Sequence, residues 1–122
     1  MTSASLLPTS TAQAIQLAEV TQLAPAGIVS RTVLQTPEVR VVMFTFADGQ
    51  ELTSHTNRRR VLVHVLEGEC EFQFGGEWQR LAAGALLHLP PNDPHAVRAS
   101  FGTFSMLLTF AAEAATTAEN LP

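Results

Sequence analysis

The feature that most constrains the fold is a series of short β-rich segments separated by turn residues. Residues 27–36 and 38–49 are rich in β-branched and aromatic side chains, and Gly or Pro stands at their margins. Similar segments follow up to about residue 110, with turn signals roughly every 8–12 residues and no helical stretch of useful length. This pattern predicts an all-β chain folded as an antiparallel sandwich or barrel.

The chain has 122 residues, which suits one domain. With 46% hydrophobic residues it can build a core. The Ser- and Thr-rich residues 1–14 are expected to form a flexible N-terminal arm, and residues 112–122 a C-terminal tail. We therefore predict a single domain over residues 15–111.

Charge and cysteine content narrow the function classes. The formal net charge of −4 argues against nucleic acid as a partner. The first basic residue is Arg31, and no apolar run is long enough for a secretory signal or a membrane span. The only cysteine, Cys70, shares a strand face with two phenylalanines, so we expect a core residue rather than a nucleophile. These features predict a cytoplasmic protein without a membrane partner.

The segment 61–66 is apolar on both faces of the predicted strand. One face carries Val61, Val63 and Val65, and the other carries Leu62, His64 and Leu66. One set should line the barrel, so His64 should point outward. The outer set needs a cover, either residues 13–34 or a second subunit. We therefore expect a homodimer, formed by sheet packing across this face or by exchange of the N-terminal segment.

Two spaced motifs resemble those of the cupin family. In the first, Gly49 is followed after five residues by His55 and later by Gly68. In the second, Gly84 is followed by "ALLHLPPNDPHAVRA", in which Asn92 stands where the family has Gly and His95 where it has His. The resemblance covers roughly residues 38–110. It implies an RmlC-like cupin, an antiparallel double-stranded β-helix or jelly-roll barrel, with Asn92 in a left-handed turn.

The resemblance also implies where a metal would bind. A complete cupin site resembles a cage of three histidines and one carboxylate, whose positions here are His55, Asn57, Val61 and His95. Two ligands remain, since Asn is weak and Val cannot coordinate. The expected cofactor is at most a loosely bound divalent ion (Zn, Ni, Cu, Fe or Mn), held by His55 and His95.

Other polar residues stand near this frame in the sequence. Strand alternation places Glu51 and Thr53 on the face of His55, which would make Glu51 a substrate contact at the barrel mouth. The alternation does not determine whether His88 points into or out of the barrel, because both alternating sets of positions in its segment are apolar. Residues 58–60 are three arginines, and we expect them to be solvated. The alternative is that they attract a small anion to the rim of the barrel.

Three functions fit these observations, and whether the chain is an enzyme stays open. The first is a small-molecule-binding or sensory cupin with a degenerate metal site, whose ligand pocket is lined by His55, Asn57, Val61, Val63 and His95. The second is a metal-dependent enzyme of dioxygenase or isomerase type that uses His55 and His95. The third is a non-catalytic β-sandwich interaction protein. We prefer the first, with an unknown small molecule as the partner.

Overall fold

The computed structural model describes residues 5–21 and 25–112. They form nine strands and one helical turn: α1 (Leu17–Val20), β1 (Ile28–Gln35), β2 (Val39–Phe46), β3 (Glu51–His55), β4 (Val61–Glu67), β5 (Glu69–Phe74), β6 (Glu77–Ala82), β7 (Leu86–Leu89), β8 (His95–Arg98) and β9 (Phe104–Ala111). The predicted all-β barrel is confirmed. No helix among these residues is long and apolar enough to cross a membrane.

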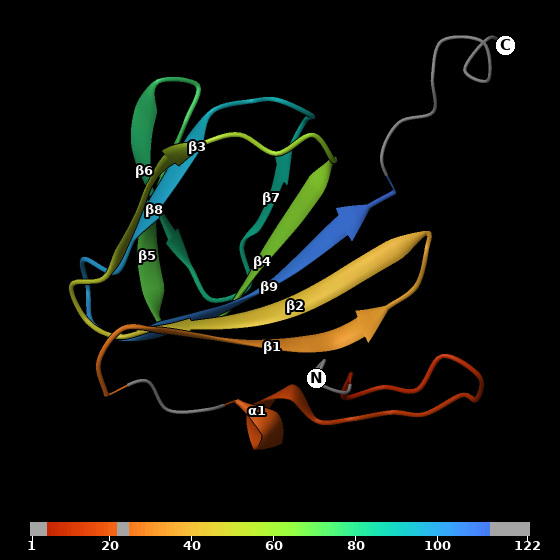
Figure 1. The fold of residues 1–122 in the computed structure, drawn as a ribbon. Helices are drawn as coiled ribbons and strands as arrows, with labels where there is room; N and C mark the ends of the chain where they lie inside the picture. The colour runs from red at the N-terminus through yellow and green to blue at the C-terminus, as the bar shows by residue number, and fades with distance from the viewer. Residues whose placement is uncertain (1–4, 22–24, 113–122) are drawn as a thin grey trace, which may run out of the picture.

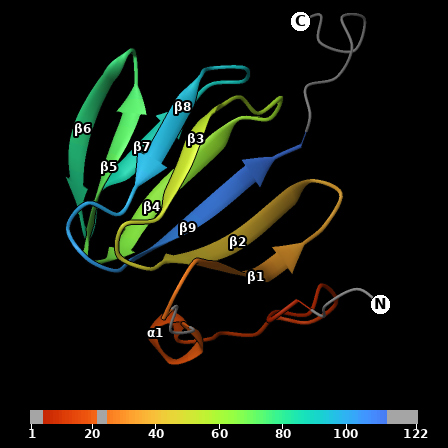
Figure 2. The same ribbon diagram turned by 60° about the vertical axis from the view of Figure 1, so that its left-hand side comes forward.

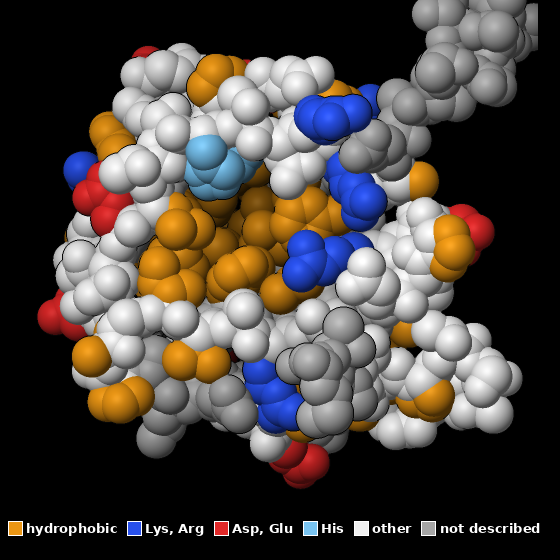
Figure 3. Space-filling view, in the orientation of Figure 1, with side chains coloured by type: hydrophobic (Ala, Val, Ile, Leu, Met, Phe, Trp, Pro, Cys, Tyr) orange, Lys and Arg blue, Asp and Glu red, His pale blue; other side chains and the backbone are white. Residues whose placement is uncertain are grey.

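The strands form two antiparallel sheets that face each other (Figures 1 and 2). One sheet has the order β1-β2-β9-β4-β7 and the other the order β3-β8-β5-β6. The chain passes from one sheet to the other six times, at the connections β2–β3, β3–β4, β4–β5, β6–β7, β7–β8 and β8–β9. The barrel is hollowed on the side that faces the viewer in Figure 3.

The core lies between the two sheets. Its largest fully buried side chains include three phenylalanines, Phe46, Phe72 and Phe104. Cys70 is buried beside them, and burial raises the pKa of its thiol to about 12. A thiol with so high a pKa is almost entirely protonated at neutral pH, so Cys70 is a core residue, as the alternation along β5 predicted.

Three turn positions belong to the motif frame. Gly68 joins β4 to β5 at φ +76°, and a Cβ atom there would lie 2.6 Å from the carbonyl oxygen of Thr103. Gly84, between β6 and β7, has φ +94° with no atom within 4 Å of the Cβ position. Asn92 has φ +64° and is, among the residues described, the one non-glycine residue with positive φ. The predicted left-handed turn at Asn92 is therefore confirmed.

The N-terminal segment covers part of the outer face of the five-stranded sheet. Leu6 and Leu7 donate backbone hydrogen bonds to the carbonyls of Thr32 and Val33 in β1, at 3.1 and 2.8 Å. α1 packs beside Leu66 at the end of β4. The cover is incomplete, because on the β4–β7 side Leu62 and Leu86 remain 41% and 68% exposed.

Candidate functional site

A cavity of about 110 Å³ lies inside the barrel toward its open end. Its wall is largely apolar, with two imidazoles and one amide, and its lining residues are Phe44, Leu52, His55, Asn57, Val61, His95, Met106, Leu108 and Phe110. In the space-filling view, apolar side chains form the floor of the hollow, with histidine on one side and arginine on the other (Figure 3). The cavity is the candidate ligand site, because it is concave, apolar and carries a few converging polar groups.

The two histidines of the motifs meet in this cavity. His55 of β3 and His95 of β8 are opposite each other in the strand pairing, and their ring centroids are 4.3 Å apart in an edge-on arrangement. Each Nδ1 lies 2.8 Å from the backbone carbonyl two residues earlier, that of Thr53 or Asp93. Since a carbonyl can only accept, each Nδ1 carries a proton and donates it, so the neutral form of each ring has its lone pair on Nε2.

The environment keeps His95 neutral. Its side chain is 6% exposed, and burial lowers the pKa of its imidazole from the usual 6.5. The neighbouring His55 lowers the pKa of His95 further, whereas the hydrogen bond to the Asp93 carbonyl opposes the shift. At neutral pH His95 therefore offers its Nε2 as a hydrogen-bond acceptor or as a ligand for a metal.

Asn57 has a structural task in addition to its place in the cavity wall. Its side-chain Oδ1 accepts a hydrogen bond from the backbone N–H of Arg59 at 2.8 Å. Its backbone carbonyl accepts one from the N–H of Asn92 at 2.7 Å, which ties the β3–β4 loop to the turn before β8. The amide oxygen that could have served as a weak metal ligand thus shapes the loop that follows it.

The valines divide between the cavity and the core. Val61 is 2% exposed and forms part of the cavity wall, at the position of the family's carboxylate. Val63 is buried in the hydrophobic core and is not among the residues that line the cavity. Of the five predicted pocket residues, the structure therefore brings four together and leaves Val63 behind the wall.

The predicted inward face of Glu51 is wrong, and Thr53, which was expected on the same face, is exposed and does not line the cavity. The pairing of β3 with β8 shifts between Leu52 and His55, so that β3 contains one extra residue. This bulge reverses the alternation, and Leu52 shares the cavity with His55, while Glu51 lies opposite Arg98 and is exposed. The residue pattern does not reveal a bulge, so strict alternation along this strand predicted the wrong face for Glu51.

The other two histidines lie outside the barrel. His64 is exposed, as predicted. His88, whose face the sequence left open, is exposed and pairs with Leu62 across β4 and β7. Its Nε2 accepts a hydrogen bond from the guanidinium of Arg60 at 2.7 Å. Neither histidine contributes to the cavity.

The residues present do not fit the four-ligand metal cage that the fold implies. His55 and His95 supply two Nε2 atoms, the amide oxygen of Asn57 is held by Arg59, and Val61 has no donor atom. Across residues 5–21 and 25–112, no group of three or more His, Cys, Asp or Glu side chains is placed to hold a metal ion. A buried divalent ion would also lack the carboxylate that compensates its charge.

Sequence reasoning missed the aromatic and aliphatic part of the wall. Met106, Leu108 and Phe110 alternate along β9 and face inward beside Val65, Val63 and Val61 of β4. The alternation along β9 was a usable signal for this shared face. The position of Phe110 toward the open end of the barrel depends on pairing between strands far apart in the sequence.

Comparison with known proteins agrees with this architecture. The family model described as "Cupin domain" matches residues 42–110, which is more than half of the chain. The protein therefore belongs to the cupin family. No curated protein sequence gives a significant match.

Among solved structures, an RmlC-like cupin from Desulfovibrio desulfuricans is 32% identical with a TM-score of 0.73, covering 83% of this chain and 97% of its own. A conserved protein of unknown function from Streptococcus pyogenes is 26% identical with a TM-score of 0.77, covering 93% and 98%. A cupin superfamily protein from Desulfitobacterium hafniense, 23% identical, shares the fold with a TM-score of 0.77, covering 91% and 99%. These neighbours place the chain among small single-domain cupins.

Proposed function

We propose that the chain is a small-molecule-binding cupin, with a binding or sensory role, whose ligand occupies the barrel cavity. The observation that carries this proposal is the pair of Nε2 lone pairs of His55 and His95 on the wall of an otherwise apolar cavity. A ligand hydroxyl or amide N–H would donate to the Nε2 of His95, the buried member of the pair, and its apolar part would pack against Val61 and the β9 side chains.

The size of the cavity limits the apolar part of the ligand. A cavity of 150 Å³ in another protein holds one benzene ring. At about 110 Å³, the space here is smaller, so a short alkyl chain fits below the mouth and a ring would extend partly into the mouth. Benzyl alcohol and toluene are therefore suitable probes, because they have the same ring and differ in one hydroxyl donor.

The test is a binding measurement by NMR on the wild type and on His95→Leu, with His64→Leu as the matched control on the outer face. We expect both probes to perturb the signals of cavity residues. Benzyl alcohol should bind about fivefold more tightly than toluene, as expected for one hydrogen bond of about 1 kcal/mol. That preference should vanish in His95→Leu and persist in His64→Leu. Absence of any perturbation at cavity residues by either probe would refute the proposal.

A metal-dependent enzyme is the second candidate, and the same imidazole pair favours it. Two neighbouring Nε2 lone pairs are half of a tetrahedral site for a nitrogen-preferring ion such as zinc. Elemental analysis of the purified protein separates the two candidates. One stoichiometric ion in the wild type, lost in both His55→Ala and His95→Ala, would place the enzyme first.

A further inference from the structure

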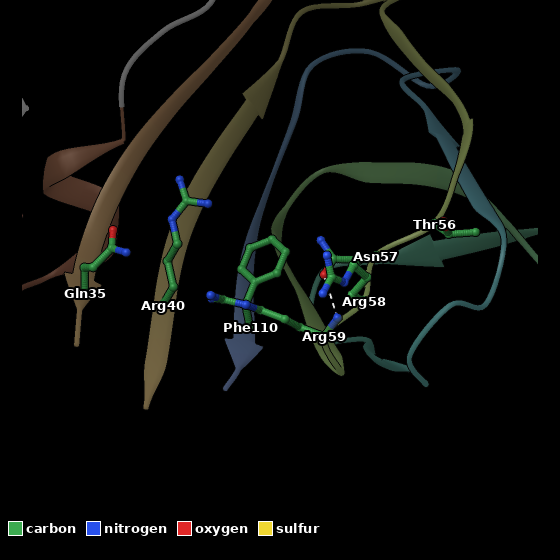
Figure 4. A pocket seen from close by; sticks show the side chains of 7 residues that line it. All are labelled: Gln35, Arg40, Thr56, Asn57, Arg58, Arg59 and Phe110. Atoms are coloured by element: carbon green, nitrogen blue, oxygen red, sulfur yellow. Dashed lines mark hydrogen bonds between the residues drawn. The ribbon is translucent and has the colours of Figure 1, made fainter. Parts of the chain in front are cut away.

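A second, wider space of about 740 Å³ lies at the open end of the barrel, above the cavity. Its lining residues are Gln35, Arg40, Thr56, Asn57, Arg58, Arg59 and Phe110 (Figure 4). Asn57 and Phe110 line both spaces, so the two meet at these residues. A ligand in the cavity would therefore extend into a mouth lined by arginines.

The described charged residues that line this mouth are basic, whereas the chain as a whole is acidic. The chain has 7 Lys and Arg residues against 11 Asp and Glu residues, yet three of its arginines line the mouth. Of the described residues that line either space, none is Asp or Glu. Glu38, two residues before Arg40 in the sequence, is exposed and does not line the mouth. The local field therefore favours an anion.

The arginines are held at the mouth by the fold. Arg40 lies opposite Phe110 in the pairing of β2 with β9, and its guanidinium carbon is 5.8 Å from the centre of that ring. The backbone N–H of Arg59 donates a hydrogen bond to the Asn57 side chain at 2.8 Å, which fixes the backbone from which the Arg59 side chain extends to line the mouth. The N–H of Ala111 bonds the carbonyl of Arg60 at 3.0 Å and fixes the end of the same loop. Arg40 and Arg59 therefore border Phe110 from two different elements.

We propose that the ligand carries an oxyanion head group, a carboxylate or a phosphate, bound at the mouth by Arg40 and Arg59, with its apolar body in the cavity. This inference rests on the proposed function and adds the chemical class of the ligand. Guanidinium groups bind both kinds of oxyanion through two parallel N–H donors. Phe110 separates the charged mouth from the apolar cavity and so contacts the point where head and body join.

The experiment compares three probes that share a benzyl group: phenylacetate, benzyl phosphate and the neutral 2-phenylethanol. Binding is measured by NMR on the wild type and on Arg40→Gln, Arg59→Gln and the control Arg80→Gln. Arg80 is an exposed residue of β6 that pairs with Glu69 at 2.6 Å and lines neither space. All three variants remove one positive charge, so an effect of net charge alone would be equal in all three.

We expect at least one anionic probe to bind about tenfold more tightly than 2-phenylethanol, with an advantage that shrinks as salt is added. Arg40→Gln and Arg59→Gln should each weaken that probe about fivefold, as expected for a partly exposed charge pair. Both should leave 2-phenylethanol unchanged, which also shows that the cavity is intact. Arg80→Gln should alter neither. The ratio of phenylacetate to benzyl phosphate affinity assigns the head group.

Two results would overturn the inference and leave the proposed function standing. One is equal binding of charged and neutral probes in the wild type. The other is an equal loss of anion affinity in Arg80→Gln, which would indicate an effect of net charge alone. If none of the three probes perturbs the cavity, the proposed function itself fails, and this inference fails with it.

Discussion

Replacement of Gly68 by alanine should destabilise the fold far more than replacement of Gly84. Both glycines belong to the motif frame, and both have positive φ, +76° and +94°. An alanine in this region costs about 1–2 kcal/mol of stability at either position. The two positions differ in their surroundings, and this difference allows the contributions of conformation and contact to be separated.

At Gly68 the new Cβ would lie 2.6 Å from the Thr103 carbonyl oxygen and 3.1 Å from Cα of Phe104. Both are backbone atoms, so relief requires movement of the β8–β9 connection, and Phe104 is a fully buried core residue. We estimate about 2 kcal/mol for that distortion, in the range of core overpacking. The total for Gly68→Ala is then roughly 3–4 kcal/mol, against about 1–2 kcal/mol for Gly84→Ala.

The assay is equilibrium unfolding in urea, followed by the fluorescence of Trp78 and by circular dichroism. The difference between the two variants should be about 2 kcal/mol, which for a domain of this size corresponds to a melting-temperature difference of several degrees. Equal destabilisation of both variants would refute the reasoning, because it would mean that the contact with Thr103 relaxes at no cost. A variant of Gly68 that is too unstable to fold, beside a folded Gly84→Ala, would agree with it.

Three further predictions concern the metal site, pH and assembly. Asn57→His combined with Val61→Glu should bind a divalent ion and gain about 2.7 kcal/mol at 100 times its Kd, whereas a chelator should barely move wild-type melting. Burial lowers the pKa of His95, so as pH falls the unfolded chain takes up the proton on this residue before the folded chain does. The contribution of His95 to the free energy of unfolding is therefore complete above pH 6.5 and is lost as pH falls through the folded pKa. In urea titrations, His95→Gln should show a smaller change of stability with pH than the wild type. We also propose a homodimer through the exposed Leu62 and Leu86, which Leu86→Glu should dissociate; a wild-type monomer in sedimentation at tens of micromolar would contradict it.

Much of the fold was predictable from the sequence because its signals are local. The turn at Asn92 and the core position of Cys70 follow from residue type and alternation, and both are confirmed. The meeting of His55 and His95 was accessible only through the resemblance of two motifs, since 40 positions separate the two histidines and no local pattern links them.

The remaining features depend on pairing between distant strands. The bulge in β3 exchanged Leu52 for Glu51 at the cavity, and nothing in the residue pattern marks it. Arg40 reaches the mouth because β2 pairs with β9, which places it opposite Phe110. A sequence reading can locate β-strands and still leave such neighbours undetermined, because register is a property of the folded sheet.

A carboxylate at position 61 and an anion bound at the arginine mouth would repel each other. A glutamate at Val61 would put a negative charge on the cavity wall, below the site proposed for the anionic head group. At a separation of about 8 Å and an effective dielectric constant of about 20, the repulsion is about 2 kcal/mol. Val61→Glu should therefore weaken an anionic probe about 30-fold, and the neutral control Val61→Gln should weaken it much less. Because burial raises the pKa of an introduced carboxyl, the difference should grow between pH 6 and pH 9. Equal affinities of the two variants for phenylacetate across that range would show that the head group does not lie above Val61.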